Sequence, residues 1–190
     1  MIWDQAFPKG AIVTDDATGP RRVERPAVMD ESTFEAFYKK TSRPLWVYIR
    51  RISGDAALAD DILQEAYFRF LRVQLSGMDE TQMKSYLYKI ATNLINDHWR
   101  SQKREQKSTD ESELLRPAPE HSTDLSQVLR ELNSQQRSLL WLAYVEGNEH
   151  KEIAQVLGLK EKSIRVLLFR ARRKLAELLS QRGFCLRKKS

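Results

Sequence analysis

The chain has 190 residues, a formal net charge of +6, 41% hydrophobic residues and 31% charged residues. This composition is typical of a globular protein with one or two small domains, and it excludes a disordered chain or a membrane-embedded one. No apolar run approaches the roughly 18 residues of a membrane span, and the N-terminus lacks the apolar core of a signal peptide. Cys185 is the only cysteine, which excludes an internal disulfide and a zinc finger and favours a cytoplasmic location.

The positive charge is concentrated at the C-terminal end. Residues 160–190 contain eleven Lys or Arg and two acidic residues, a net charge of +9, so residues 1–159 carry −3. Such a block favours a polyanionic partner, nucleic acid first and an anionic membrane surface second, although a solvated basic tail is the plain alternative.

Residues 1–30 show no periodicity and contain several prolines, which predicts a flexible extension. Ser32, with Glu35 three residues later, has the pattern of a capping box and predicts the start of a helix that ends near Ser53. Pro44 lies inside this helix and is expected to kink or break it.

Two more helices are predicted at about 55–75 and 81–103, because apolar residues recur there at intervals of three and four. The segment 104–123 is polar, contains Pro117 and Pro119, and predicts a linker.

Beyond the linker, four further helices are predicted at about 124–133, 134–146, 149–157 and 161–181. Glycines mark the ends of two of them, in line with the preference for glycine at helix C-termini. The predicted fold class is therefore all-α. It consists of two small helical domains, 31–103 and 124–181, joined by a flexible polar linker and followed by a basic tail at 182–190.

The second domain has the spacing of a helix-turn-helix. A short helix ends at Leu157, a tight turn follows at 158–160, and the next helix has an apolar stripe opposite a basic face, as in a recognition helix that enters the major groove. Arg165 is the best candidate for contact with a base edge, whereas Arg170, Arg172 and Arg173 are equally suited to phosphates. Val166 and Phe169 on the same outward face are placed to touch thymine methyl groups or to pack on a neighbouring element, and the sequence leaves both open.

The helices of the first domain carry two different polar stripes. The stripe of the second helix is acidic with one aromatic residue, which is as typical of a protein-docking face as of a solvated one; it comprises Asp61, Gln64, Glu65, Phe68 and Arg72. The stripe of the third helix suits a single strand of nucleic acid, because aromatic rings stack on bases, Asn reads a base edge, and Lys or Arg holds phosphates. It comprises Tyr86, Lys89, Asn93, Asp97, Arg100 and Arg104.

Three segments, in this order and around a polar linker, resemble the extracytoplasmic-function sigma factors, the smallest class of bacterial RNA polymerase sigma subunits. They are DDILQEAYFRF (60–70), SYLYKIATNLINDHWR (85–100) and LNSQQRSLLWLAYVEGNEHKEIAQVLGLKEKSIRVLLFRARRKL (132–175). The resemblance implies a protein that binds core RNA polymerase, recognises the minus-ten and minus-thirty-five promoter elements and promotes DNA opening.

The resemblance also implies roles for individual residues. Docking on the clamp helices of the largest polymerase subunit falls to Asp60, Asp61, Gln64, Glu65 and Phe68. Contact with minus-ten DNA, together with the loop at 75–82, falls to Asn93, with Asp97 one turn further along. We add Lys84, Tyr86, Lys89 and Arg100 of the same helix as candidate contacts. Contact with minus-thirty-five DNA falls to Arg165 and Arg170, and further candidates on the same helix are Lys162, Ser163, Val166, Phe169 and Arg173.

The second domain of such proteins also meets the flap of the second-largest polymerase subunit, and an anti-sigma factor is a further candidate partner. Family members often read Ser-Arg where this chain has Val166-Leu167, which bears on its preference for the upstream element. The resemblance implies no cofactor, no metal, no catalytic residue and no insertion into a membrane.

Two other functions fit parts of the sequence. A helix-turn-helix transcriptional regulator that does not dock on polymerase accounts for the second domain, but it leaves the segments 60–70 and 85–100 unexplained. An enzyme acting on nucleic acid lacks candidate chemistry, because His98, His121 and His150 are far apart in sequence and no cysteine pair accompanies them.

Overall fold

The computed structural model of the chain describes residues 29–73, 77–108 and 124–184. Within these ranges the chain forms seven α-helices and no strand, in agreement with the predicted all-α class. They are α1 (Glu31–Ser53), α2 (Ala56–Leu71), α3 (Glu80–Ser108), α4 (Asp124–Glu131), α5 (Ser134–Tyr144), α6 (His150–Leu157) and α7 (Glu161–Gln181). Most of the predicted N-terminal extension, residues 109–123 of the linker and residues 185–190 of the tail lie outside the described residues.

The first helix begins earlier than predicted, because Asp30 rather than Ser32 is its N-cap. The Asp30 carboxylate accepts a hydrogen bond from the backbone N–H of Thr33 at 2.9 Å, and it also accepts from the hydroxyls of Ser32 and Thr33. The hydrogen bonds from Ser32 and Thr33 hold the pKa of Asp30 well below its ordinary value. The capping box predicted at Ser32 was therefore wrong: the Ser32 hydroxyl donates to the true cap.

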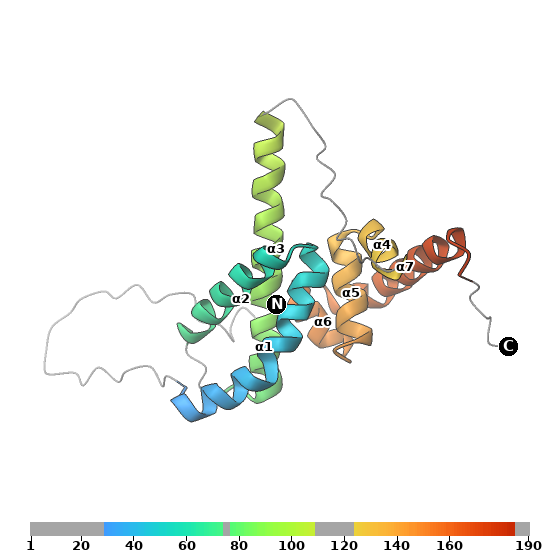
Figure 1. Cartoon of the computed structure of the whole chain (residues 1–190). Helices are drawn as coiled ribbons and strands as arrows, with labels where there is room; N and C mark the ends of the chain where they lie inside the picture. The colour runs from blue at the N-terminus through green and yellow to red at the C-terminus, as the bar shows by residue number, and fades with distance from the viewer. Residues whose placement is uncertain (1–28, 74–76, 109–123, 185–190) are drawn as a thin grey trace, which may run out of the picture.

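Pro44 does not end α1. The helix continues from Glu31 to Ser53 with Pro44 inside it, and Figure 1 shows it changing direction along its length. Proline removes one helical hydrogen bond and crowds the preceding turn. Buried residues on both sides of it, among them Phe37, Leu45 and Tyr48, pack into the core, and this packing keeps the two halves in one helix.

The predicted boundary between α1 and α2 is confirmed. Gly54 takes the left-handed conformation, with φ of 82°, and its N–H donates to the Arg50 carbonyl at 2.9 Å. Asp55 then caps α2 by accepting from the N–H of Leu58 at 3.2 Å. The third helix runs on to Ser108, so residues 104–108 belong to α3 and not to the linker.

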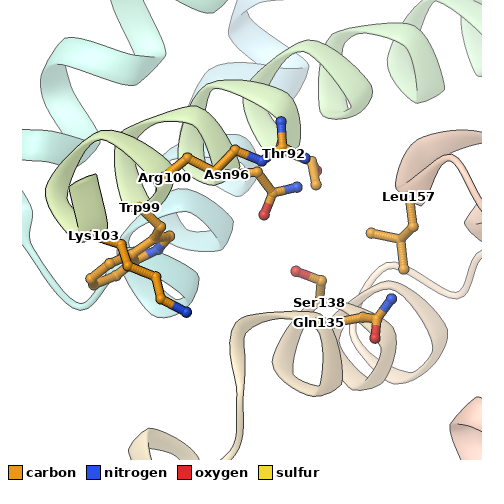
Figure 2. A pocket seen from close by; sticks show the side chains of 8 residues that line it. All are labelled: Thr92, Asn96, Trp99, Arg100, Lys103, Gln135, Ser138 and Leu157. Atoms are coloured by element: carbon orange, nitrogen blue, oxygen red, sulfur yellow. The ribbon is translucent and has the colours of Figure 1, made fainter. Parts of the chain in front are cut away.

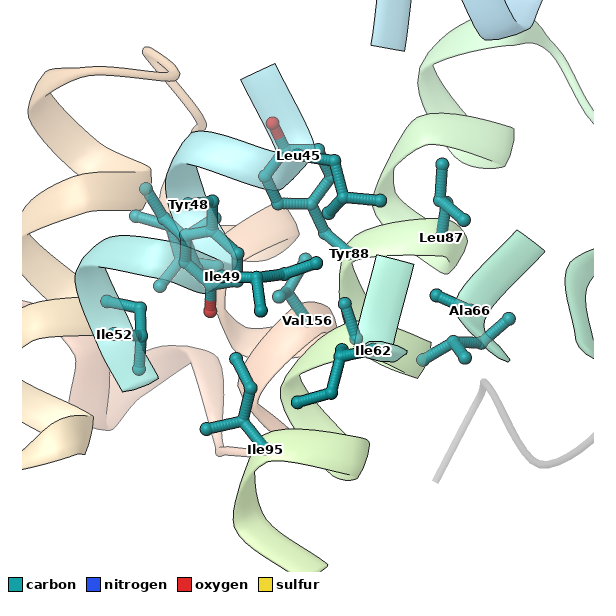
Figure 3. Packing of buried hydrophobic residues seen from close by; sticks show 14 of the residues in the cluster. Leu45, Tyr48, Ile49, Ile52, Ile62, Ala66, Leu87, Tyr88, Ile95 and Val156 are labelled. Carbon is teal, nitrogen blue, oxygen red and sulfur yellow. The ribbon is translucent and has the colours of Figure 1, made fainter. Parts of the chain in front are cut away.

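Helices α1–α3 form the N-terminal bundle and helices α4–α7 form the C-terminal bundle (Figure 1). A single hydrophobic core runs through both. Figure 3 shows Val156 of α6 among the side chains of Tyr48 and Ile49 from α1 and of Tyr88 from α3. A smaller cluster stays within the C-terminal bundle, formed by Val128, Leu132, Leu140, Ala171 and Leu178. The sequence predicted the two bundles but not the core that they share.

Buried polar groups also cross the contact between the bundles. The Tyr48 hydroxyl of α1 lies 2.8 Å from Oγ1 of Thr92 on α3 and donates to Oγ of Ser138 on α5 at 3.2 Å. Burial raises the pKa of Tyr48. The Arg137 guanidinium of α5 donates to the Ile52 carbonyl at 2.7 Å and so satisfies a carbonyl in the last turn of α1. Burial lowers the pKa of Arg137.

None of the helices in the described ranges combines the length and the apolar character that crossing a bilayer requires.

The hydroxyl of Tyr48 is the simplest probe of the contact between the bundles. In Tyr48→Phe, Ser138 and Thr92 stay buried without that partner, so we expect the free energy of unfolding to fall by about 1–2 kcal/mol, measured by urea denaturation. Tyr38→Phe is the matched control, because Tyr38 is 41% exposed, and it should stay within about 0.5 kcal/mol of the parent chain. Equal effects of the two substitutions would contradict the role of the Tyr48 hydroxyl.

Candidate nucleic-acid and protein interfaces

The outward face of α2 combines acidic and amide side chains with one aromatic ring. Asp61, Gln64 and Phe68 lie on one line of the helix and are all exposed, and Phe68 is 57% exposed. The Arg72 guanidinium lies 5.3 Å from the centre of the Phe68 ring. Glu65 lies on the same line, half-buried and paired with Arg69 at 2.6 Å. This face offers hydrogen-bond acceptors around an exposed ring, which suits a protein partner better than DNA.

Asp60 lies at the edge of this face, where α2 meets α1. The indole Nε1 of Trp46 donates to Asp60 Oδ1 at 2.6 Å. Next to it, α1 and α2 enclose an open groove of about 460 Å³, lined by Tyr38, Ser42, Arg43, Trp46, Val47 and Leu63. The structure thus brings four of the five predicted docking residues onto one line and orients Asp60 toward α1.

The outward stripe of α3 is polar at its centre and partly buried at its start. Asn93 and Asp97 are exposed, and Arg100, one turn further along, pairs with Asp97 at 3.2 Å. Lys89 and Tyr86 are half-buried. The centre of the Tyr86 ring lies 6.4 Å from that of Phe70, and burial raises the pKa of Tyr86. Tyr86 is therefore in part a core residue and offers only part of its ring to a ligand.

Lys84 does not join this stripe. At about 100° per residue it lies almost opposite Tyr86 on α3, and it faces the C-terminal bundle. Its ammonium is 2.9 Å from Oε2 of Glu146, whose side chain is only 7% exposed. Trp141 Nε1 donates to the other Glu146 oxygen at 3.1 Å. The Lys84 ammonium also lies 5.7 Å from the centre of the Tyr88 ring.

Glu146 is the residue of this contact that sequence reasoning missed. Burial, and after it the negative charge of Glu146, raise the pKa of Tyr88. The only sequence signal for this pair was the angular position of Lys84, which sets it apart from the other predicted DNA contacts. Nothing in the sequence around Glu146 identifies it as the buried partner.

A cleft of about 350 Å³ separates part of α3 from the C-terminal bundle (Figure 2). It is lined by Thr92, Asn96, Trp99, Arg100 and Lys103 of α3, Gln135 and Ser138 of α5, and Leu157 of α6. Arg100 thus belongs both to the outward stripe and to the wall of this cleft, and the cleft carries the positive charges of two α3 side chains.

The helix-turn-helix predicted in the C-terminal bundle is confirmed. Gly158 takes the left-handed conformation between α6 and α7, with φ of 65°, and the Leu159 N–H donates to the Ala154 carbonyl at 2.8 Å. Ile153 of α6 and Ile164 of α7 are fully buried. The structure brings the predicted upstream contacts together on the outward side of α7; Ser163 is half-buried, and Lys162, Arg165, Val166, Phe169, Arg170 and Arg173 are exposed.

Among the residues that the structure describes, no group of three or more His, Cys, Asp or Glu side chains is arranged to hold a metal ion. His98 lies on α3 and His150 opens α6. His121 lies outside the described residues.

Comparisons with known proteins all find similarity to bacterial sigma factors. Residues 37–105 match the family "Sigma-70 region 2", and residues 122–175 match "Sigma-70, region 4". The chain is 31% identical to the ECF RNA polymerase sigma factor BldN of Streptomyces coelicolor, over 87% of this chain and 67% of that protein. It is 27% identical to SigM of Bacillus subtilis, over 78% of this chain and 96% of SigM. A solved structure of the sigma factor RpoE in complex with the anti-sigma factor NepR from Bartonella quintana is similar, with a TM-score of 0.65 and 25% identity over 77% of this chain and 96% of RpoE.

The pair of Lys84 and Glu146 can be compared with a pair of the same length at the surface. Lys40 and Glu80 are also 2.9 Å apart and join α1 to α3, but their side chains are 63% and 58% exposed. A double-mutant cycle with Lys84→Met and Glu146→Gln should give a coupling free energy of about 1–3 kcal/mol in urea unfolding, because Glu146 is shielded from water. The same cycle at Lys40 and Glu80 should give less than about 1 kcal/mol. Coupling no larger at the first pair than at the second would contradict a buried ion pair.

Proposed function

The chain belongs to the extracytoplasmic-function sigma factors, which direct RNA polymerase to promoters, and from this premise we propose how its surfaces divide that work. The observation that carries the proposal is the presence of three chemically different exposed faces on three helices: acidic with an aromatic ring on α2, amide and charged on α3, and cationic on α7. Sigma factors are in general DNA-recognition proteins and not enzymes, and we assign no catalytic residue.

The face on α2 is assigned to the clamp helices of the largest polymerase subunit. Phe68 supplies an exposed aromatic anchor, and Asp61 and Gln64 beside it supply hydrogen-bond acceptors. An acidic face of this kind is repelled by DNA phosphates, so it directs the DNA toward the other helices. Glu65 and Asp60 flank it and hold their own partners in the free chain.

The stripe on α3 is assigned to the opened non-template strand of the minus-ten element. Asn93 has the amide that reads a base edge, and Arg100 and Lys89 carry the charges that hold phosphates. Opening costs about 1.4 kcal/mol per base-pair step, and stacking a captured base on an aromatic side chain returns about 1–3 kcal/mol. Captured bases therefore offset part of the cost of opening, and polymerase and phosphate contacts supply the rest of the affinity.

The helix-turn-helix is assigned to the minus-thirty-five element as duplex DNA, with α7 in the major groove. Arg165 and Arg170 lie on its outward side among further cations. The C-terminal bundle is also assigned to the flap of the second-largest polymerase subunit.

Lys84 was predicted to contact DNA, but its position fits a structural role in the contact between the two bundles. Its charge is paired with Glu146 across the bundle contact, so it reaches DNA only if the two bundles separate. The similar sigma factor RpoE was crystallised with an anti-sigma factor, and the likeness covers both bundles. This supports the proposal that an anti-sigma factor also binds this chain while its bundles are packed together.

Transcription in vitro tests the function directly. With core RNA polymerase and a library of random promoters, the chain should produce transcripts from templates that share two sequence elements. A chain that selects duplex DNA but neither binds core polymerase nor yields transcripts would instead be a helix-turn-helix regulator.

Asp61→Lys tests the docking face. We expect it to weaken binding to core polymerase by roughly tenfold or more, because it places a cation where the face offers an acceptor. Binding is measured by fluorescence anisotropy with the labelled full chain. Glu35→Lys, a charge reversal at an exposed site on α1, is the control and should bind core normally. Normal core affinity of the Asp61 variant would refute the docking face.

Asn93→Ala tests the stripe on α3. In the complex with core polymerase, we expect DNA opening to slow by roughly tenfold, the effect of losing one base-edge contact, while binding of the upstream element persists. Permanganate reactivity of unpaired thymines measures the opening. Gln181→Ala removes an exposed amide at the end of α7 and should leave the rate unchanged. An unchanged opening rate in the Asn93 variant would remove that residue from the minus-ten contact.

A further inference from the structure

The outward surface of α7 has an apolar centre. Its buried line consists of Ile164, Leu168, Ala171 and Leu178. At about 100° per residue, the line directly opposite consists of Lys162, Val166, Phe169 and Arg173, which fall within an arc of about 60°. Val166 and Phe169 occupy the middle of this outer line. The middle of the part of α7 that projects furthest from the bundle is therefore apolar, between Lys162 at one end and Arg173 at the other.

Neither apolar side chain is covered by another part of the described chain. Val166 is 51% exposed and Phe169 is 58% exposed, and neither packs against either hydrophobic cluster. The sequence left open whether they pack on a neighbouring element, and the structure answers that they do not. A valine and a phenylalanine exposed together at the crest of a cationic helix indicate an apolar partner outside the described part of the chain.

The cations of α7 lie on the two sides of this crest. In the same projection Arg165 and Arg172 fall about 70–90° to one side, and Arg170 falls about 70° to the other. All three are exposed. Arg173, on the crest itself, is paired with Glu177 at 3.1 Å. When a helix lies in the major groove, its crest meets the base edges and its flanks meet the two phosphate walls.

This arrangement assigns an apolar contact to the floor of the groove. Among the base-edge groups displayed there, the thymine C5-methyl is the apolar one, and the others are hydrogen-bond donors and acceptors. We infer that Val166 is a specificity-determining residue that contacts a thymine methyl group in the upstream promoter element, with Phe169 extending the same apolar surface one turn further. The inference rests on the assignment of α7 to duplex DNA in the proposed function. The upstream element is then read in part by methyl contact, and the flanking arginines supply affinity.

Deoxyuridine provides a probe that removes the methyl group and nothing else. The full chain bound to core polymerase is tested on a promoter from the library, with each upstream thymine replaced in turn by deoxyuridine, and affinity is measured by competition. Burial of one methyl group corresponds to about a fourfold change in affinity. We expect one or two positions to show this loss with the parent chain.

Val166→Ser should abolish the discrimination between thymine and deoxyuridine at one of those positions and bind both forms like the deoxyuridine form. Val145→Ser is the matched control, because Val145 is 60% exposed at the end of α5 and lies off the crest of α7. It should keep the full discrimination. Both variants should bind core polymerase with the affinity of the parent chain.

Two results would overturn the inference. The first is that the parent chain binds every deoxyuridine promoter as tightly as the thymine promoter. The second is that the Val166→Ser variant discriminates between thymine and deoxyuridine as the parent chain does, in which case Val166 contacts a protein partner instead of DNA. Core binding and transcription of the parent chain report separately on the proposed function. If they fail, the same comparison on duplex DNA selected by the chain itself still decides the role of Val166.

Discussion

The buried carboxylate of Glu146 is the constraint on which the arrangement of the two bundles depends. A carboxylate that is 7% exposed is stable only if opposite charge and hydrogen-bond donors surround it. Trp141 belongs to the same bundle as Glu146, but Lys84 comes from the N-terminal bundle, so the Glu146 carboxylate has its cationic partner only while the two bundles are in contact. The shared apolar core and the Tyr48 hydroxyl then stabilise the same contact. Rotation of one bundle against the other is therefore opposed by charge, by hydrogen bonds and by packing together.

This contact leaves the other surfaces free for their partners. The acidic face of α2, the stripe around Asn93 on α3 and the crest of α7 are all exposed while the bundles are packed. Among the predicted DNA contacts on α3, Lys84 lies between the two bundles, and Arg100 lines part of the cleft between them. In the proposed function the two bundles bind promoter elements some distance apart on DNA, an assignment that implies their separation on the promoter. Separation breaks the pair of Lys84 and Glu146 and exposes part of the shared apolar core to water, a cost that polymerase and DNA contacts must exceed.

Local signals in the sequence were sufficient for the helices but not for their contact. Gly54, Asp55 and Gly158 end and begin helices through backbone conformations and caps that depend on a few neighbouring residues, and they were predicted correctly. The N-cap at Asp30 was missed because Ser32 offered an equally regular pattern, and the helix continues through Pro44 because distant residues pack on both sides of it. The shared core and Glu146 depend on residues some fifty positions or more apart, for which periodicity carries no signal.

The face of the helix on which a charged side chain lies decides which partner that side chain can contact. The net charge of +9 over residues 160–190 indicated a nucleic-acid partner, yet on α7 the exposed arginines lie mainly along the flanks and two apolar residues occupy the middle of the crest. Charge on the flanks increases affinity for any phosphate backbone and discriminates little between sequences. Discrimination must then come from the residues that touch the base edges, and the exposed residues in the middle of this crest, Val166 and Phe169, are apolar. The same reasoning separates Lys84 from Asn93 on α3: they lie on one helix nine positions apart, but one faces the other bundle and one faces outward.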